Sequence, residues 1–334
     1  FVSFYSEEEI YKILPSLFGK VIYDENYTSV AMESLLREKI PTTNPVIAMQ
    51  ASKNAVEIEV ARMGHIKDAV ALCESFAWIY TTPGKTEYEI SEQITYFRSL
   101  QDGYVMDSFA PIVGFRQNGA IIHYSPKEYS AAVVEGEGLL LIDSGGHYFG
   151  CTTDVTRNLV FGIPKPEMKQ RYTEVLKGHL RLAMQKFPEG TAASNIDILA
   201  RMHLWQNGLD YTHGTGHGVG NMLSVHEKPV SIRQRHANTA LKEGMIVSNE
   251  PGFYKVGEYG IRIENLMYVK KSFEGFLEFE TITLMPYCKA LMDLPALDKS
   301  ELEYLQHYYK RIEIEILPLL TDKAKKWLKN ELDL

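Results

Sequence analysis

Two pairs of acidic residues stand at similar spacings in different parts of this 334-residue chain. Asp143 ends the apolar run 139–142, and Asp154 follows 11 residues later. Glu250 and Glu264 lie 14 residues apart. Both separations suit hairpins, so each pair could offer two carboxylates at one place. Four such anions stay ionised only with counter-charge, which hard divalent cations such as Mn²⁺, Mg²⁺ or Ca²⁺ supply to oxygen ligands.

A glycine-rich segment with histidines lies between the two acidic pairs. Residues 213–220 read His-Gly-Thr-Gly-His-Gly-Val-Gly, and His226 follows in a Val-His-Glu triplet. Glycines at this density permit close backbone approach and disfavour a helix, and an HExxH zinc site is excluded because position 214 is glycine. One imidazole with four carboxylates favours a two-metal hydrolytic centre, in which a bridging water becomes the nucleophile.

Each of these residues also has a simpler interpretation when it is taken alone. An acidic residue at the end of a strand can belong to a surface turn or cap a helix. A histidine in a glycine-rich loop can be a core residue whose ring nitrogens are hydrogen-bonded. The hypothesis of a metal centre therefore depends on the combination and not on any single residue.

The elements that must position these residues follow a repeated order of two helices and then strands, which indicates two halves of similar plan. A cap at Asn54 and helical spacing of apolar residues predict the first helix. The expected helices cover 54–80, 86–100, 166–187 and 194–208, the strand-rich stretches cover 105–161 and 210–285, and an amphipathic helical region covers 298–334. Within the first strand-rich stretch, the apolar run 119–123 is one of the expected strands. Near the start, 21–23 is expected as a strand and 41–45 as a linker.

Composition narrows the class of protein. The chain has 35 Lys and Arg against 43 Asp and Glu, and 45% of its residues are hydrophobic, values that exclude a disordered chain and argue against a nucleic-acid binder. No apolar run approaches the ~20 residues of a membrane helix. The three widely spaced cysteines argue against a disulfide framework or a thiolate zinc site and favour a reducing, cytoplasmic compartment.

Six segments taken in order resemble the pita-bread metallopeptidase family, which includes methionine aminopeptidase, prolidase and aminopeptidase P. The segments are Ile122-His123-Tyr124, Leu141-Ile142-Asp143-Ser144-Gly145, Thr153-Asp154-Val155-Thr156-Arg157, the run 213–220, Asn249-Glu250-Pro251-Gly252 and Gly260-Ile261-Arg262-Ile263-Glu264-Asn265. The chain looks most similar to the larger cytosolic Xaa-Pro aminopeptidase subgroup. The resemblance implies an α+β pita-bread fold, with a curved, mostly antiparallel sheet, helices on its outer face and two pseudo-twofold halves.

The resemblance also implies an organisation of the chain. Residues 51–287 would form the catalytic domain, and 288–334 would form a C-terminal helical extension. Residues 1–50 would be the remnant of a preceding non-catalytic α/β domain, so that the chain is expected to be the C-terminal part of a longer protein. Members of the family are commonly homodimers, and a homodimer is expected here.

Metal ligation is assigned to five residues by the resemblance. Asp143 would bind one metal ion, Asp154 and Glu264 would bridge two ions, and His217 and Glu250 would complete the other site. Glu250 would also act as the general base and then the general acid. The two divalent ions are expected to be manganese, with cobalt or zinc able to substitute.

The resemblance gives roles to five further residues, around the substrate or around the metal ligands. His226 would polarise the scissile carbonyl group, and His123 and His213 would position the substrate near the proline or the leaving amine. Arg262 and Tyr254 would orient the metal ligands.

The implied activity is removal of an N-terminal residue that precedes proline from short peptides, by a hydroxide that bridges two metal ions. Prolidase, which cleaves Xaa-Pro dipeptides, is the alternative enzyme, and a catalytically weak fragment is another. Methionine aminopeptidase fits the C-terminal tail and the histidine motif poorly. A metal-free binding module is disfavoured because all five ligands are present.

Overall fold

The computed structural model describes residues 3–235 and 239–333. The chain divides into two compact units, Phe1–Gln50 and Ala51–Leu334. Among the helices of the described residues, none combines the length and the apolar character that are needed to cross a membrane.

The first unit contains little buried apolar surface. It consists of the short helices α1 (Ile10–Ile13) and α2 (Val30–Ser34), the parallel strand pair β1 (Lys20–Tyr23) and β2 (Glu38–Pro41), and most of α3 (Pro45–Ala51). Strand β1 confirms the strand expected at 21–23. The linker expected at 41–45 is partly wrong, because Pro45 begins α3, a position where the fixed φ of proline is favourable. Within the described part of this unit only Asp24 and Leu36 are buried.

Two capped helices open the second unit. In α4 (Ala55–Thr81), the Asn54 side chain accepts hydrogen bonds from the backbone of Val56 and Glu57, which confirms the predicted start. The next helix, α5 (Glu87–Ser99), begins after Thr86, whose side chain accepts from the Glu89 N–H. Both predicted helices are therefore present to within two residues, because capping chemistry marks helix starts in the sequence.

The first sheet of this unit has the order β4 (Ile112–Phe115), β5 (Gly138–Ser144) and β8 (Val155–Phe161), all antiparallel. The hairpin of β6 (Gly146–Tyr148) and β7 (Cys151–Thr152) joins β5 to β8, and β6 also pairs with β3 (Tyr104–Asp107). Asp143 thus lies opposite Thr156, close to where Asp154 enters β8.

The strand expected at 119–123 is wrong. Residues Arg116–Ala120 form a 3-10 helix, followed by a turn. The Asn118 amide is held there by the buried Glu87 carboxylate, at 2.9 Å from its Oε1. Gly114 and Gly119 approach so closely that a Cβ on Gly114 would lie 2.7 Å from the Gly119 nitrogen. These tertiary contacts override the apolar character of the run.

The second sheet carries the later motifs. Its order is β11 (Glu227–Ile232), β10 (Gly216–Gly218), β12 (Ile246–Asn249), β15 (Asn265–Lys271), β16 (Phe276–Thr281) and β9 (Lys186–Pro188), and neighbouring strands are antiparallel. A separate hairpin, β13 (Gly252–Lys255) and β14 (Tyr259–Arg262), follows β12. Glu250 and Glu264 therefore lie at the two ends of one hairpin, as their spacing predicts.

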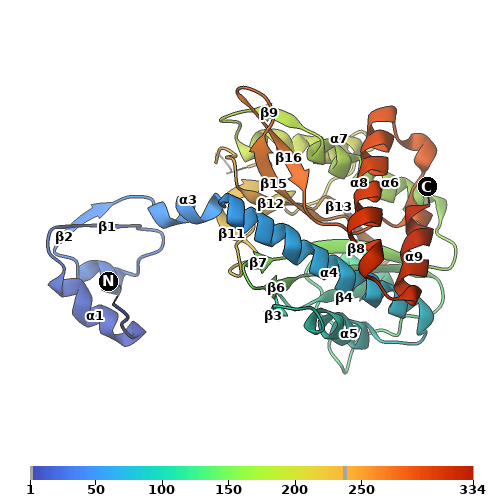
Figure 1. The fold of residues 1–334 in the computed structure, drawn as a ribbon, viewed down its shortest axis with the longest axis horizontal. Coiled ribbons are helices and arrows are strands. Elements are labelled where there is room, and N and C mark those ends of the chain that lie inside the picture. The colour runs from blue at the N-terminus through green and yellow to red at the C-terminus, as the bar shows by residue number, and fades with distance from the viewer. Residues whose placement is uncertain (1–2, 236–238, 334) are drawn as a thin grey trace. The chain divides into compact units, whose positions relative to one another are not determined.

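The remaining helices differ from expectation at their ends. They are α6 (Pro166–Ala183), α7 (Asp197–Trp205), α8 (Lys299–Glu315) and α9 (Asp322–Leu332). The helix expected at 166–187 ends early because 186–188 pair with β16 as β9. The helix expected at 194–208 begins as a 3-10 turn, and the C-terminal region is two helices with 3-10 residues Leu317–Leu319 between them. Helix α9 packs against α4 (Figure 1). The rings of Phe76 and Trp327 meet edge to face between these two helices.

We predict that limited proteolysis with a non-specific protease removes the first unit before it cuts the second. The first unit has too little buried apolar surface to resist local opening, whereas the second has an extensive core. Mass spectrometry should identify a stable product that begins between residues 41 and 54. First cleavage inside 55–333 would contradict this expectation.

Candidate metal centre

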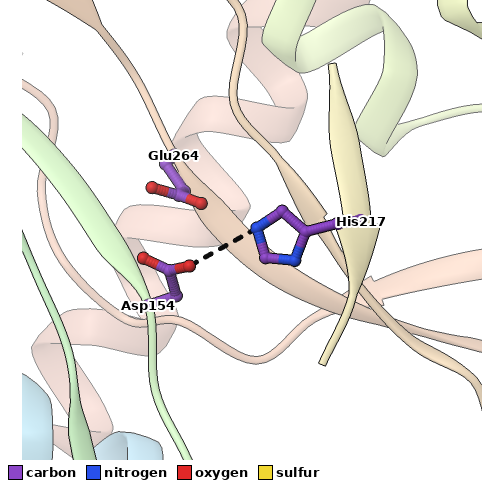
Figure 2. Close-up of side chains that lie close together, drawn as sticks. All are labelled: Asp154, His217 and Glu264. Carbon is purple, nitrogen blue, oxygen red and sulfur yellow. Dashed lines mark ion pairs between the residues drawn. The ribbon is translucent and has the colours of Figure 1, made fainter. Parts of the chain in front are cut away.

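Three side chains from separate strands and loops converge in the second unit. Each of Asp154, His217 and Glu264 offers a ligand atom, and these atoms lie within 4.8 Å of one another. Figure 2 shows the Asp154 carboxylate and the His217 ring pointing toward each other, with 3.5 Å between Oδ2 and Nε2, and Glu264 beside them. Asp154 precedes β8, His217 lies on β10, and Glu264 follows β14. The cluster therefore joins both sheets.

Close packing of the strand that carries His217 depends on glycine. A Cβ added to Gly216 would lie 2.0 Å from the Ser248 carbonyl oxygen on the neighbouring strand β12. The Ser248 hydroxyl accepts a hydrogen bond from the His217 N–H and donates one to Glu250 Oε1. The glycine-rich sequence thus lets the backbone of β10 lie tightly against β12, which fixes His217 relative to Glu250.

The other two predicted ligands adjoin this cluster. Glu250 Oε1 lies 3.4 Å from His217 Nε2. Asp143 Oδ2 accepts a hydrogen bond of 2.6 Å from Arg262 Nη2. The second oxygen of Asp143, Oδ1, is buried and has no hydrogen-bond partner among the described residues. All five predicted metal ligands therefore lie in one buried region.

Burial and mutual repulsion perturb the carboxyl groups. Burial, followed by the charges of Asp143 and Glu250, raises the pKa of Asp154 well above its usual range. Burial and the charge of Asp154 do the same to the pKa of Glu264. Burial also raises the pKa of Glu250, although His217 and Arg262 partly oppose this.

Divalent cations fit these residues. A cation would give the unpaired Asp143 Oδ1 a partner. It would also neutralise the repulsion that keeps the carboxyl groups from all ionising together. Carboxylate oxygens with one imidazole suit manganese, iron, cobalt or zinc.

A second layer of polar groups holds the carboxylates in place. Arg262 Nε donates to the Thr156 hydroxyl at 3.1 Å, and this hydroxyl donates to Glu264 Oε2 at 2.7 Å. Arg262 Nη1 donates to the Tyr254 hydroxyl at 2.8 Å. One arginine therefore contacts Asp143 directly and Glu264 through Thr156. The sequence motif alone does not indicate this role of Thr156, which follows from its position opposite Asp143 in the sheet.

The geometry around His213 defines its protonation. Its Nδ1 lies 2.8 Å from the Gly214 carbonyl oxygen, so Nδ1 carries the hydrogen and Nε2 accepts from the Tyr254 hydroxyl at 2.8 Å. Burial, with the nearby Arg262 charge, lowers the pKa of His213 to about 3. The ring is therefore neutral, with both nitrogens bonded inside the protein. A substrate-positioning role for His213 stays a prediction.

Two histidines lie beside the cluster. The rings of His226 and His217 are nearly perpendicular, with centroids 4.1 Å apart. His226 is exposed overall, but desolvation of its ring and the neighbouring His217 lower its pKa to about 4, so the ring is neutral at physiological pH. His123 is exposed and close enough for its charge to act on both His213 and His226.

Two residues outside every sequence motif anchor the histidine segment. Asp197 and Arg201, both buried on α7, form an ion pair with 2.7 Å between Oδ2 and Nε. Asp197 accepts a hydrogen bond from the Thr215 hydroxyl, and Arg201 donates to the His213 carbonyl. The Thr215 carbonyl in turn accepts from the Glu250 N–H. An Asp four residues before an Arg on one helix face was the available signal.

The buried Arg157 is hydrogen-bonded to the backbone of Glu264. Its Nη1 donates to the Glu264 carbonyl oxygen at 2.6 Å, and its Nη2 donates to the Met285 carbonyl oxygen at 2.8 Å. The Tyr308 hydroxyl, on α8, donates to that same Met285 oxygen at 2.8 Å. The C-terminal extension is thus hydrogen-bonded to the backbone around a predicted metal ligand.

The fold and the cluster of candidate metal ligands are typical of a metallopeptidase. Residues 59–271 match metallopeptidase family M24, and residues 275–333 match the C-terminal region of peptidase M24. The chain belongs to metallopeptidase family M24 and has the α+β pita-bread fold.

Particular relatives refine this assignment. Xaa-Pro aminopeptidase 1 of Dictyostelium discoideum is 43% identical over 94% of this chain and 53% of its own length. The crystal structure of an X-prolyl aminopeptidase from Caenorhabditis elegans, described as a cytosolic enzyme with a di-nuclear active site, superposes with a TM-score of 0.91 at 34% identity over 98% of this chain and 57% of that one. An Xaa-Pro dipeptidase from Bacillus anthracis gives 0.72 at 27% identity, over 83% of this chain and 77% of that one. The chain spans about half the length of the curated relatives it matches.

We predict that Glu264→Gln stabilises the metal-free protein increasingly as the pH rises from 5 to 8. The raised pKa of Glu264 means that the native state holds a proton that the unfolded state has released, so the carboxylate penalises folding more at higher pH. Thermal melting of EDTA-treated proteins measures the difference, which should reach a few degrees at pH 8.

The comparison must be made between variant and wild type at each pH. The lowered pKa values of His213 and His226 give the opposite trend, and this trend is common to both proteins. With Mn²⁺ present the order should reverse, since the glutamine is a poorer ligand. A melting difference that is independent of both pH and Mn²⁺ would show that Glu264 does not belong to a cluster of mutually repelling, metal-binding carboxylates.

Proposed function

We propose that this chain is the catalytic part of a metal-dependent Xaa-Pro aminopeptidase, which removes an N-terminal residue that precedes proline. The observation that carries the proposal is the convergence of Asp154, His217 and Glu264 within 4.8 Å. Similarity to proteins named Xaa-Pro aminopeptidase, at 43% identity, supports the choice of substrate. Prolidase is less well supported, since the prolidase from Pyrococcus furiosus shares 26% identity.

Asp143, Asp154, His217, Glu250 and Glu264 would hold two divalent ions, most suitably manganese, with cobalt or zinc as substitutes. Such ions supply the positive charge that activates a water molecule and polarises the scissile carbonyl group. The protein contributes the fixed positions of these side chains, which Arg262, Thr156 and Ser248 secure by hydrogen bonds.

Glu250 is the proton carrier in this proposal. Burial raises its pKa, which makes its carboxylate a stronger base than an exposed glutamate. Its Oε1 would take the proton of the attacking water and return it to the leaving proline nitrogen. This transfer matters because the nitrogen of an Xaa-Pro bond has no hydrogen of its own and must gain one to leave as an amine.

His226 is the proposed electrophile. Its neutral ring beside His217 can donate an N–H hydrogen bond to the carbonyl oxygen as negative charge develops there. His123 is exposed nearby and would contact the proline or the peptide beyond it. His213 would shape the same region through its bond to Tyr254. The acidic cluster would also attract the free α-amine of the substrate.

We further propose a cytoplasmic location, a homodimeric state and a preceding domain to which residues 1–50 belong. Three buried free cysteines and the cytosolic description of the Caenorhabditis elegans relative support the location. Exposed apolar side chains such as Phe4, Phe18 and Val30 support further packing around the first unit. The homodimer is proposed from the family resemblance.

We predict Mn²⁺-dependent release of the first residue from tripeptides such as Ala-Pro-Ala, and much slower cleavage of the dipeptide Ala-Pro. A dipeptidase must engage the carboxylate directly after proline, whereas an aminopeptidase need not. Chromatographic assay of both peptides with the full-length protein, after EDTA treatment and after Mn²⁺ loading, makes the measurement. Preferred cleavage of the dipeptide would establish a prolidase, and intact tripeptides would overturn the proposal.

We predict that Glu250→Gln lowers kcat by about 10²–10⁴-fold, the range for loss of a general acid–base group. The substitution keeps the size of the side chain and removes its ability to carry the proton. Metal content by mass spectrometry must be measured in parallel, because Glu250 is also a proposed ligand. Full metal content with unchanged kcat would exclude the proton-transfer role.

A further inference from the structure

Lys53 contacts the segments on both sides of β10, the strand that carries His217. Its backbone N–H donates to the Gly244 carbonyl oxygen at 2.9 Å, in the turn that leads into β12. A Cβ on Gly244 would lie 2.3 Å from the Lys53 carbonyl oxygen, so the two backbones are in close contact. The Lys53 side chain reaches the other way, to the Glu227 carboxylate at the start of β11. Lys53 thus connects β12 to β11 across the intervening strand β10.

The lysine–glutamate pair is buried in this position. The side chains of Lys53 and Glu227 are 2% and 9% exposed. Burial lowers the pKa of Lys53 and raises that of Glu227, and each charge opposes the shift of the other. A buried pair of this kind is costly to break, because the remaining partner would be an uncompensated charge. The pair therefore holds its geometry firmly.

Glu227 links the ion pair with Lys53 to the segments that carry His217 and His226. It pairs with Gly218 on β10, directly after His217, and it directly follows His226 in the chain. A Cβ on Gly218 would lie 2.4 Å from the Glu227 carbonyl oxygen, so β11 meets β10 at close range there. Fixing Glu227 consequently fixes the backbone from which His226 reaches the His217 ring.

We propose that Lys53 is a positioning residue that, through Glu227, sets the orientation of His226 toward the substrate. The proposal rests on the proposed function in one respect, namely that His226 contacts the scissile carbonyl group. Among the described residues, the hydrogen bonds of Lys53 go to Ala51, Gly244 and Glu227, none of which is a proposed metal ligand. Lys53 also lies outside every motif that carries the family resemblance.

The test uses the Mn²⁺-loaded protein and the tripeptide Ala-Pro-Ala. Lys53→Met should lower kcat by about 10- to 100-fold, the scale of a misplaced catalytic group, with little change in KM or metal content. Lys53→Arg keeps the charge and should recover most of the activity. The double variant K53M/E227Q leaves no unpaired buried charge, so it should fold normally and still be slow.

Lys177→Met is the matched control. Lys177 also pairs with a buried glutamate, Glu301, at 2.6 Å, but on the outer helices α6 and α8. Arg181 pairs with the same glutamate at 3.0 Å, so the loss of stability should be smaller than in K53M. The K177M variant should lose stability without losing kcat. Equal losses of kcat in K53M and K177M would overturn the proposal, because they would indicate a general effect of breaking a buried pair.

A double-mutant cycle separates action through His226 from any other route. In the H226A background, K53M should cause no further loss of kcat, since the group that it orients is absent. Additive losses, or full activity of K53M alone, would overturn the proposal.

A readout without turnover separates failure of this inference from failure of the proposed function. In a histidine-labelled sample freed of paramagnetic Mn²⁺, K53M should shift the His226 side-chain NMR signal and K177M should not. If the wild-type protein leaves tripeptides intact while K53M shifts that signal, the proposed function fails and the positioning contact stands. An unshifted signal would overturn the positioning role.

Discussion

Repulsion among carboxyl groups in one buried space is the constraint on which the rest of this structure depends. Asp143, Asp154, Glu250 and Glu264 lie together at the meeting of two sheets, and burial raises the pKa of three of them. Such a group is unfavourable for folding by itself and becomes favourable when cations neutralise it. The surrounding polar contacts prevent the chain from relieving the repulsion by moving the carboxylates apart. Arg262 is central among them, because it bonds to Asp143 and, through Thr156, to Glu264.

Positions around the cluster are set by contacts between segments far apart in the sequence. The histidine segment is fixed by Asp197 and Arg201 from α7, and its flanking strands are joined by Lys53 and Glu227. Asp197, Arg201 and Lys53 are buried, and each forms an ion pair, so their geometry is well defined. Catalysis that depends on distances of a few ångströms requires this kind of support.

The sequence allowed prediction of features that local chemistry determines. The cap at Asn54 located the start of α4, and spacing placed two acidic pairs on hairpins. The run 119–123 does not form the expected strand, because contacts with Glu87 and Gly114 decide its conformation. Glu87 is distant along the chain, and the close approach of Gly114 exists only in the folded backbone. For the same reason Asp197, Arg201 and Lys53 received no role. The pairing of Asp197 with Arg201 is local, at i,i+4 on α7. Their contacts to Thr215 and His213, like the contact of Lys53 to Glu227, form only when the chain folds.

The hydrogen bonds of Arg157 join the C-terminal region to the backbone around Glu264. Arg157 binds the carbonyl oxygens of Glu264 and Met285, and Tyr308 of α8 donates to the same Met285 oxygen. Two separately recognised regions, 59–271 and 275–333, therefore share one polar network and one compact unit. The C-terminal extension is therefore hydrogen-bonded into the same compact unit as the strands that carry the proposed ligands.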